Sequence, residues 1–387
     1  MSSRTKVHLH PLKEPMLLSR RHLLLAAAYA PLPRGIRRFS DERSKREVWQ
    51  ITNDDGFNHC CYFEAQPFTA DDRYLVYASR RTGAMQLYRV DLKTEEHAQI
   101  TESKDLNSMS YSIYPDGRTV IYQEGARLVR TEVASGQVTW AVDLASLRIP
   151  GAERFSAGRT YSPDGRYTAV SYSGASEGIA LIDLGHGKVH GTIDNPAGTG
   201  GHLLICPSDP MQVTFVKKPD EQNQMDLPPD RRARTMVANF RTGAIRPFLT
   251  MPTGFRATHE YWDSRGARLY FHRKSVPGWV PTSICSVRRN GTDLQTHFTH
   301  ETLKLGHSMI SRDGRFIVSD VQEPDNNPLI HIDLRYGVHQ ILCWPDSSVK
   351  EGHPGQAHVH PSISASGKFV AYTSNKGGNP QVYVVPL

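Results

Sequence analysis

Histidines recur in the second half of the chain at fixed distances from turn residues. His259, His307 and His360 each lie seven residues before the glycine of a turn, and His202 is one position out of this register. His358 precedes His360 by two residues, so in a strand both side chains point to the same side. Neutral imidazoles that converge on one point are common donors for a divalent transition metal.

The pattern therefore predicts a metal site with His358 and His360 as two ligands and His307 as the third. Gln356 extends the same row. A lone histidine at the start of a strand is usually a structural residue that makes ordinary hydrogen bonds. Three histidines in one register favour the site over that alternative.

These histidines are carried by a unit that occurs seven times. Each unit has a short strand, a tight turn that is often Asp-Gly, and a second, alternating strand, as in YSPDGRYTAVSYS and ISRDGRFIVSD. The turn markers are separated by 45, 48, 45, 56, 48 and 53 residues: Asp72, Gly117, Gly165, Pro210, Gly266, Gly314 and Gly367. This period, with four strands per unit, is typical of β-propeller blades.

We expect an all-β fold, a seven-bladed β-propeller over residues 46–387. The seventh unit stops one strand short at Leu387, and EVWQIT, Glu47 to Thr52, can complete it from the other end of the chain. Gly174 to Gly178 matches the G-x-S-x-G pattern of a nucleophilic serine. That pattern needs a strand-to-helix turn, and here it falls in a hairpin loop, so we do not assign a nucleophile.

The excess of positive charge lies at the N-terminus. The chain has a net charge of +7, and residues 1–46 hold eleven Lys and Arg against three acids, so the remainder is close to neutral, at about −1. The predicted propeller lacks the basic face of a nucleic-acid-binding protein. Its five cysteines contain no C-x-x-C pair, so neither a zinc knuckle nor a disulfide framework is indicated.

Residues 1–45 are excluded from the predicted fold. In LLSRRHLLLAAAYAPLP, Arg20 and Arg21 precede a short apolar run and a small-residue site, which resembles a twin-arginine export signal. The run is too short to span a membrane. We therefore expect a periplasmic or secreted protein. The alternatives are a basic tail, or a true start at Met16, with a cytoplasmic location.

Three segments resemble blades of the oligogalacturonate lyase family: ATHEYWDSRGARLYF, GHSMISRDGRFIVSD and QAHVHPSISASGKFVAYTS. NHCCYFEAQPFTADDRYLVYAS and GHLLICPSDPMQVTFV are similar to its first and fourth blades. The resemblance covers residues 47–387. It implies β-elimination of short pectic oligosaccharides with Mn²⁺ held by three histidines and a glutamine. It also implies that His307, His358, His360 and Gln356 are the ligands and His259 the base.

The fourth blade departs from the family pattern. Where a His-Glu-Gly-Pro segment is expected, this chain has KKPD followed by the insertion EQNQMDLPPDRRAR. Because an anionic substrate needs basic partners, we expect Arg234 to act beside His259 in catalysis. Substrate contacts are expected from Lys217, Lys218, His202 and His59.

Two other readings stay open. A non-catalytic, TolB-like propeller would bind a periplasmic protein through its channel face and need no metal. A metal-dependent hydrolase or isomerase could use the same scaffold, because a fold does not fix a function.

Overall fold

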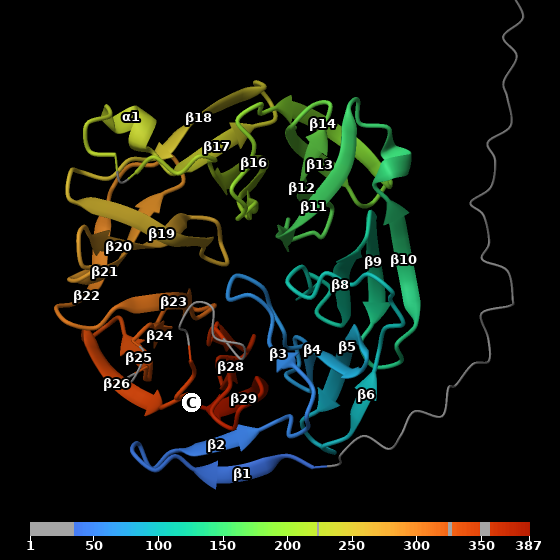
Figure 1. The fold of residues 1–387 in the computed structure, drawn as a ribbon, viewed down its shortest axis with the longest axis vertical. Coiled ribbons are helices and arrows are strands. Elements are labelled where there is room, and N and C mark those ends of the chain that lie inside the picture. Colours follow the sequence, from blue (N-terminus) through green and yellow to red (C-terminus); the bar gives the residue numbers. More distant parts are fainter. Residues whose placement is uncertain (1–34, 223, 324–326, 349–356) are drawn as a thin grey trace, which may run out of the picture. The chain divides into compact units, whose positions relative to one another are not determined.

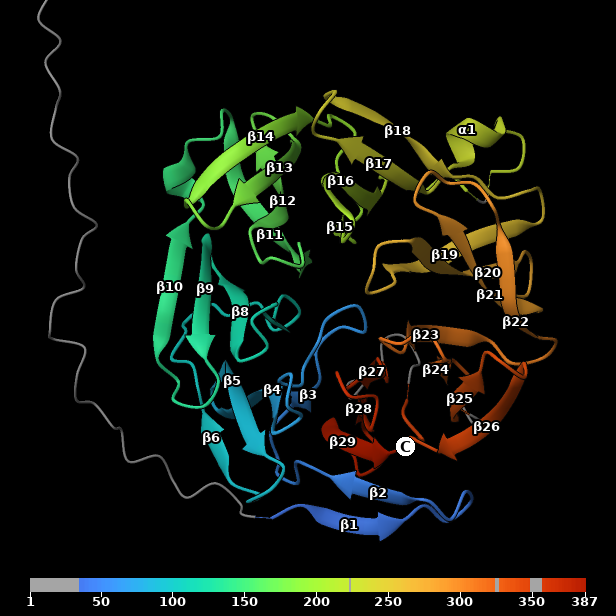
Figure 2. The same cartoon turned by 180° about the vertical axis from the view of Figure 1, so that it is seen from behind.

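The computed structural model describes residues 35–222, 224–323, 327–348 and 357–387. Seven antiparallel sheets follow one another around a ring, as Figure 1 shows and Figure 2 repeats from behind. Six sheets have four strands and one has five. The predicted seven-bladed β-propeller is confirmed.

Blades one to three are formed by twelve strands in chain order. They are β3 (Asn58–His59), β4 (Tyr74–Thr82), β5 (Ala84–Asp91), β6 (His97–Gln99), β7 (Ser112–Ile113), β8 (Thr119–Glu124), β9 (Arg127–Glu132), β10 (Val138–Asp143), β11 (Ala152–Tyr161), β12 (Tyr167–Gly174), β13 (Gly178–Asp183) and β14 (Lys188–Asp194). A short 3-10 helix, η2 (Ala145–Leu147), connects the second blade to the third.

Blades four to six follow the same plan. Their strands are β15 (Leu204–Cys206), β16 (Asp209–Val216), β17 (Thr235–Asn239), β18 (Ala244–Leu249), β19 (Phe255–Trp262), β20 (Arg268–Ser275), β21 (Thr282–Arg288), β22 (Gln295–His300), β23 (Leu305–Ile310), β24 (Phe316–Val321), β25 (Leu329–Asp333) and β26 (Val338–Cys343). One turn of helix, α1 (Pro229–Arg232), lies in the insertion between β16 and β17.

The seventh blade joins the two ends of the described chain. Its inner strands are β27 (Ser362–Ile363), β28 (Phe369–Ser374) and β29 (Gln381–Pro386), and β2 (Glu47–Gln50) pairs with β29 as the predicted fourth strand. An additional strand, β1 (Arg37–Ser40), pairs with β2 at the outer edge. The predicted domain boundary at residue 46 is therefore too late, because β1 is part of the last sheet.

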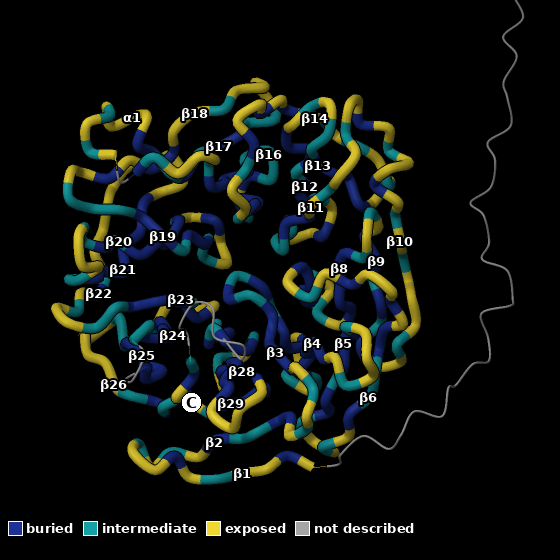
Figure 3. The backbone as a smooth tube through the Cα atoms, viewed as in Figure 1, coloured by how far each residue is buried: buried dark blue, intermediate teal, exposed yellow. Residues whose placement is uncertain are grey.

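Burial follows the position of a strand within its blade. Neighbouring blades cover both faces of a middle strand such as β13, whose residues are all buried. The outermost strands alternate, as in β14 and β10, and Figure 3 shows them largely exposed. Apolar side chains between adjacent blades form the core, which holds the inner strands at fixed distances around the centre.

The Asp-Gly turns set the hairpin register, as the turn between β11 and β12 illustrates. Gly165 has φ of 72°, a left-handed conformation that glycine adopts without strain. The Asp164 carboxylate accepts the backbone N–H of Arg166 at 3.0 Å and closes the turn. Because each turn fixes its hairpin, residues at one distance from it occupy equivalent positions in every blade.

Two predictions fall on segments outside the described residues: the export signal around Arg20 and Arg21, and the ligand Gln356. Within the part of the chain that the structure describes, no helix has the length and hydropathy of a membrane span.

Candidate functional site

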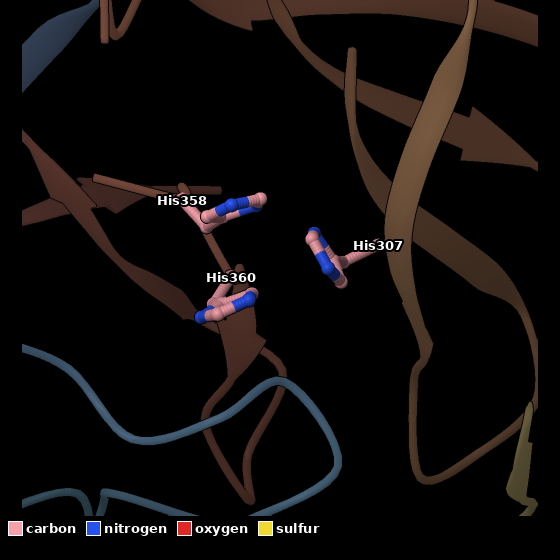
Figure 4. Close-up of side chains that lie close together, drawn as sticks. All are labelled: His307, His358 and His360. Atoms are coloured by element: carbon pink, nitrogen blue, oxygen red, sulfur yellow. The ribbon is translucent and has the colours of Figure 1, made fainter. Parts of the chain in front are cut away.

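Three of the predicted metal ligands converge in the structure. His307 lies on β23, and His358 and His360 lie in the segment that enters β27. One nitrogen from each ring lies within 4.8 Å of the others. Figure 4 shows the His307 ring reaching toward the rings of His358 and His360, which project side by side from the other blade. The ring centroids of His307 and His360 are 4.2 Å apart.

Irregular backbone aims these side chains toward one another. The ladder between β23 and β24 shifts register between Leu305 and Ser308, around His307, and the ladder between β19 and β20 shifts around His259. His360 has a left-handed φ of 45° and His259 one of 56°. Such bulges turn a side chain out of the regular alternation of a strand. His358 and His360 were predicted to point to the same side because side chains alternate along a strand. Their rings do lie 5.4 Å apart and nearly parallel, but both residues stand before β27, so strand alternation is not the cause.

Asp320 fixes the orientation of His307. The Nδ1–H of His307 can donate to Asp320 Oδ2 at 3.0 Å, and the backbone N–H of His307 donates to the other carboxylate oxygen. This leaves His307 Nε2 to bind a ligand, an arrangement that metal-binding histidines commonly use. A Cβ on Gly306 would lie 2.2 Å from Asp320 Oδ1, so only glycine allows this close approach.

Two imidazoles of the cluster, those of His307 and His360, are held in the neutral form that binds a metal. Burial lowers the pKa of His307 and of His360 well below the ordinary value, and the neighbouring histidines lower it further. Burial also raises the pKa of Asp320, to about 6. Three imidazole donors facing one point are suited to a divalent cation.

His259 lies beside this cluster. Its ring centroid is 4.3 Å from that of His307 and 5.6 Å from that of His272. Burial lowers the pKa of His259 well below its ordinary value. Among the described residues its Nδ1 has no hydrogen-bond partner. His259 is therefore a neutral imidazole next to the three ligands, with a nitrogen able to accept a proton.

Sequence reasoning missed the contribution of the first blade. In the loop after β3, the Tyr62 ring lies 4.6 Å from His360 and the Phe63 ring 5.1 Å from His307. These residues follow no repeated register. Only their aromatic character within NHCCYFEAQ offered a signal, and it did not distinguish them from core residues.

Glu64, in the same loop, anchors the predicted residue His202. Its carboxylate lies 3.2 Å from His202 Nδ1 and 3.3 Å from Arg159 Nε. Burial raises the pKa of Glu64, but the charges of Arg159 and His202 outweigh it and keep this pKa below the ordinary value. The Tyr62 hydroxyl is 3.3 Å from His202 Nε2, so His202 is connected to the cluster through Tyr62.

Arg234 contacts the residue next to His259 in the chain, Glu260. Its Nε is 3.4 Å from a carboxylate oxygen of Glu260, the residue that follows His259, and its other guanidinium end lies 3.0 Å from Asp220. Arg256 shares the same oxygen of Asp220 at 3.2 Å. Asp220, which directly precedes the insertion in blade four, thus contacts two arginines, one of them Arg234 at the end of that insertion, an arrangement that the sequence alone did not indicate.

The remaining predicted substrate contacts have other surroundings. Lys217 Nζ pairs with Glu221 at 2.9 Å, and Lys218 is exposed. His59 is buried in β3, where its Nδ1 lies 2.8 Å from the carbonyl oxygen of Cys60. The structure brings His259 and His202 near the ligand cluster, and Arg234 to Glu260, the residue after His259. His59 lies close enough to the cluster for its charge to lower the pKa of His360. For Lys217 and Lys218 the structure shows no contact with the three ligands among the described residues.

The fold and the histidine cluster define a seven-bladed propeller with a candidate site for a divalent metal. No family model matches the chain. The chain is 24% identical to an oligogalacturonate lyase of Dickeya dadantii over 380 residues, which span 90% of this chain and 95% of that protein. It is 22% identical to an oligogalacturonide lyase of Pectobacterium atrosepticum over 384 residues, which span 92% and 97%.

Solved structures give the same picture of the fold. A structure of oligogalacturonate lyase in complex with manganese superposes with a TM-score of 0.77 at 22% identity, covering 92% of this chain and 97% of that one. An oligogalacturonate lyase of Vibrio parahaemolyticus gives 0.75 at 21% identity. The resemblance to oligogalacturonate lyases that the sequence indicated is confirmed along almost the whole propeller.

Proposed function

We propose that this protein is a metal-dependent lyase that cleaves oligogalacturonate or a related uronate oligosaccharide by β-elimination. The observation that carries the proposal is the convergence of His307, His358 and His360 beside a fourth imidazole, that of His259, which is neutral. It stands in a chain that resembles named lyases over nine-tenths of its length. A propeller that only bound a protein partner would have no need for this convergence.

The donor set fits a divalent transition metal. Three imidazoles offer nitrogen ligands, and Asp320 fixes the ring of His307 as an outer partner does in metal sites. His307, His358 and His360 would hold the ion, with manganese the expected metal because one solved relative is a manganese complex. A bound divalent cation would act as a Lewis acid toward the substrate carboxylate.

The residues around the site then have distinct tasks. His259 would accept the proton from C5 of the uronate at its unpartnered nitrogen, because it is neutral and lies against the ligand cluster. The electron pair released at C5 forms the C4–C5 double bond, and the C4–oxygen bond to the neighbouring sugar breaks. Arg234 would place positive charge near His259, where the carboxylate next to C5 gains negative charge.

The test combines metal analysis with an activity assay. Purified protein reconstituted with Mn²⁺ should retain one equivalent after gel filtration, and it should convert oligogalacturonate to products with the ultraviolet absorbance of an unsaturated uronate. A His358→Ala, His360→Ala double variant should lose both properties. His190→Ala, which changes an exposed histidine on β14, is the matched control and should keep both.

Two outcomes would contradict the proposal. Wild-type protein that retains no metal at saturating Mn²⁺ would favour a binding propeller. Protein that retains metal and releases only saturated sugars would favour a hydrolase on the same scaffold. If His259 is the base and not a metal ligand, the His259→Ala variant should still bind the metal but should have no activity.

A further inference from the structure

Buried polar atoms without hydrogen-bond partners accumulate on one blade. In the described residues of β19 and β20 these atoms are Arg256 Nε, Thr258 Oγ1, His259 Nδ1, Glu260 Oε2, His272 Nδ1, Arg273 Nε and Lys274 Nζ. A buried donor or acceptor left unpaired costs about 1–3 kcal/mol. Such a concentration beside the histidine cluster indicates that this part of blade five binds a polar ligand.

The positive charges on this blade are incompletely neutralised. Arg256 and Lys274 are direct cross-strand partners, and like charges in that position repel. Asp220 pairs with Arg256 and also with Arg234. Lys274 is fully buried, and none of the described carboxylates forms an ion pair with it. Glu260 also contacts Arg234, at 3.4 Å, so the two carboxylates together offset the two arginines, and Lys274 is the cation left without an ion pair among the described residues. An anionic ligand at Arg256 therefore competes with Asp220, and the neighbouring Lys274 favours it.

An aromatic ring lies over these cations. Trp279, in the loop between β20 and β21, is 39% exposed, and its ring centroid is 4.4 Å from Lys274 Nζ and 5.4 Å from the Arg256 guanidinium. Its φ of 71° is left-handed, a conformation that costs a bulky residue about 1–2 kcal/mol. The backbone is held on both sides: the N–H donates to the Ser275 carbonyl at 2.9 Å, and the carbonyl accepts the Thr282 hydroxyl at 2.6 Å.

This group continues the candidate active site outward. His272, whose ring contacts His259, lies two residues before Lys274 on β20, which corresponds to about 7 Å along a strand. Arg256 likewise lies two residues from Thr258 along β19. From His259, the order along blade five is therefore Thr258 with His272, then Arg256 with Lys274, then Trp279.

We infer that Arg256 and Trp279 form a subsite for a further uronate unit of the oligosaccharide, next to the unit held at His259. The exposed part of the indole ring receives the apolar face of the sugar ring. Arg256 binds the sugar carboxylate, which competes with Asp220 for the guanidinium. Carboxylate recognition by an arginine fork and contact with a rigid aromatic ring together suit a charged sugar. This inference rests on the substrate class proposed above.

The test compares KM and kcat for one substrate, trigalacturonate, between wild-type protein and variants. Trp279→Ala should raise the KM for trigalacturonate about tenfold through the lost aromatic contact, with kcat within about twofold. Trp279→Phe should recover most of the wild-type KM, and Arg256→Gln should raise the KM as well. Tyr336→Ala is the matched control, because Tyr336 is also an exposed aromatic residue with an arginine stacked on it, in the outer turn of blade six, and it should change neither constant.

Failure of the subsite and failure of the proposed function would give different results. Wild-type protein that neither binds nor cleaves any oligogalacturonate overturns the proposed function and this inference together. Wild-type protein that cleaves trigalacturonate while Trp279→Ala keeps the same KM overturns the subsite alone. A Trp279→Ala protein that loses kcat at unchanged KM, or loses bound Mn²⁺, also overturns the subsite. The tryptophan would then support the structure of the active site and would not bind a sugar.

Discussion

Lys274 allows a quantitative prediction about stability and pH. Its pKa is lowered from 10.5 to about 7, chiefly by burial; Asp320 opposes this shift, and the charges of Arg256 and Arg234 add to it. The native pKa is thus below the unfolded one. The resulting destabilisation is complete below about pH 7 and is lost as the pH rises toward 10.5, because only the unfolded chain then binds the proton. Integrating this difference from pH 7 to pH 9 gives a rise of about 2 kcal/mol in the free energy of unfolding.

Lys274→Met should abolish that rise, since methionine fills a similar volume without an amine. Urea unfolding at pH 7, 8 and 9, at one ionic strength and without oligosaccharide, measures the dependence for both proteins. The variant should be more stable than wild type at pH 7, and the advantage should shrink by about 2 kcal/mol by pH 9. Lys368→Met, which changes an exposed lysine, controls for the loss of a charge. Parallel pH dependences of wild type and Lys274→Met would refute the reasoning and show that the buried amine stays protonated.

Three further changes test the support of the site and the edge of the fold. Asp320→Asn should weaken Mn²⁺ binding about tenfold to a hundredfold in a metal titration, because His307 loses its orienting carboxylate, and unchanged affinity would contradict that role. Gly306→Ala should act in the same direction by displacing Asp320, with an unaltered titration as the contrary result. Deleting the residues before Glu47 removes β1 and should lower Tm by a few degrees in calorimetry without loss of metal; an unchanged Tm would mean that β1 adds nothing to the last blade.

The repeat predicted the blades because each one is a local structure. A hairpin closed by an Asp-Gly turn is specified within about fifteen residues, and its register fixes which side chains face the centre. The same arithmetic could have found Asp320. Ser308 pairs with Ser319 across the turn, so the residue before Ser308 faces the residue after Ser319. His307 and Asp320 are therefore readable as neighbours from the turn alone.

Other parts of the site depend on contacts between blades and were not predictable in this way. Tyr62 and Glu64 come from a loop outside the repeat, and Asp220 comes from the segment that leads into the blade-four insertion, whose path the sequence pattern does not specify. The predicted edge at residue 46 was wrong for a similar reason. RRFS in β1 is short and charged, and it is a strand only because β2 offers it a free edge.

The backbone of the candidate site points to function independently of the comparisons. His202, His259 and His360 all have left-handed φ values, of 53°, 56° and 45°, on three different blades; His202 and His360 lie just before inner strands, and His259 lies within β19. Each conformation costs about 1–2 kcal/mol for a residue with a side chain, and glycine or asparagine would relieve it. Packing alone gives no reason to place imidazole at these positions. At His259 the distortion coincides with a shift in the ladder between β19 and β20, and His360 reaches the group that it forms with His358 and with His307, which lies at a bulge of its own. The strain is therefore best understood as a requirement for directing imidazoles from several blades toward the candidate site, where His360 is one of the three possible metal ligands.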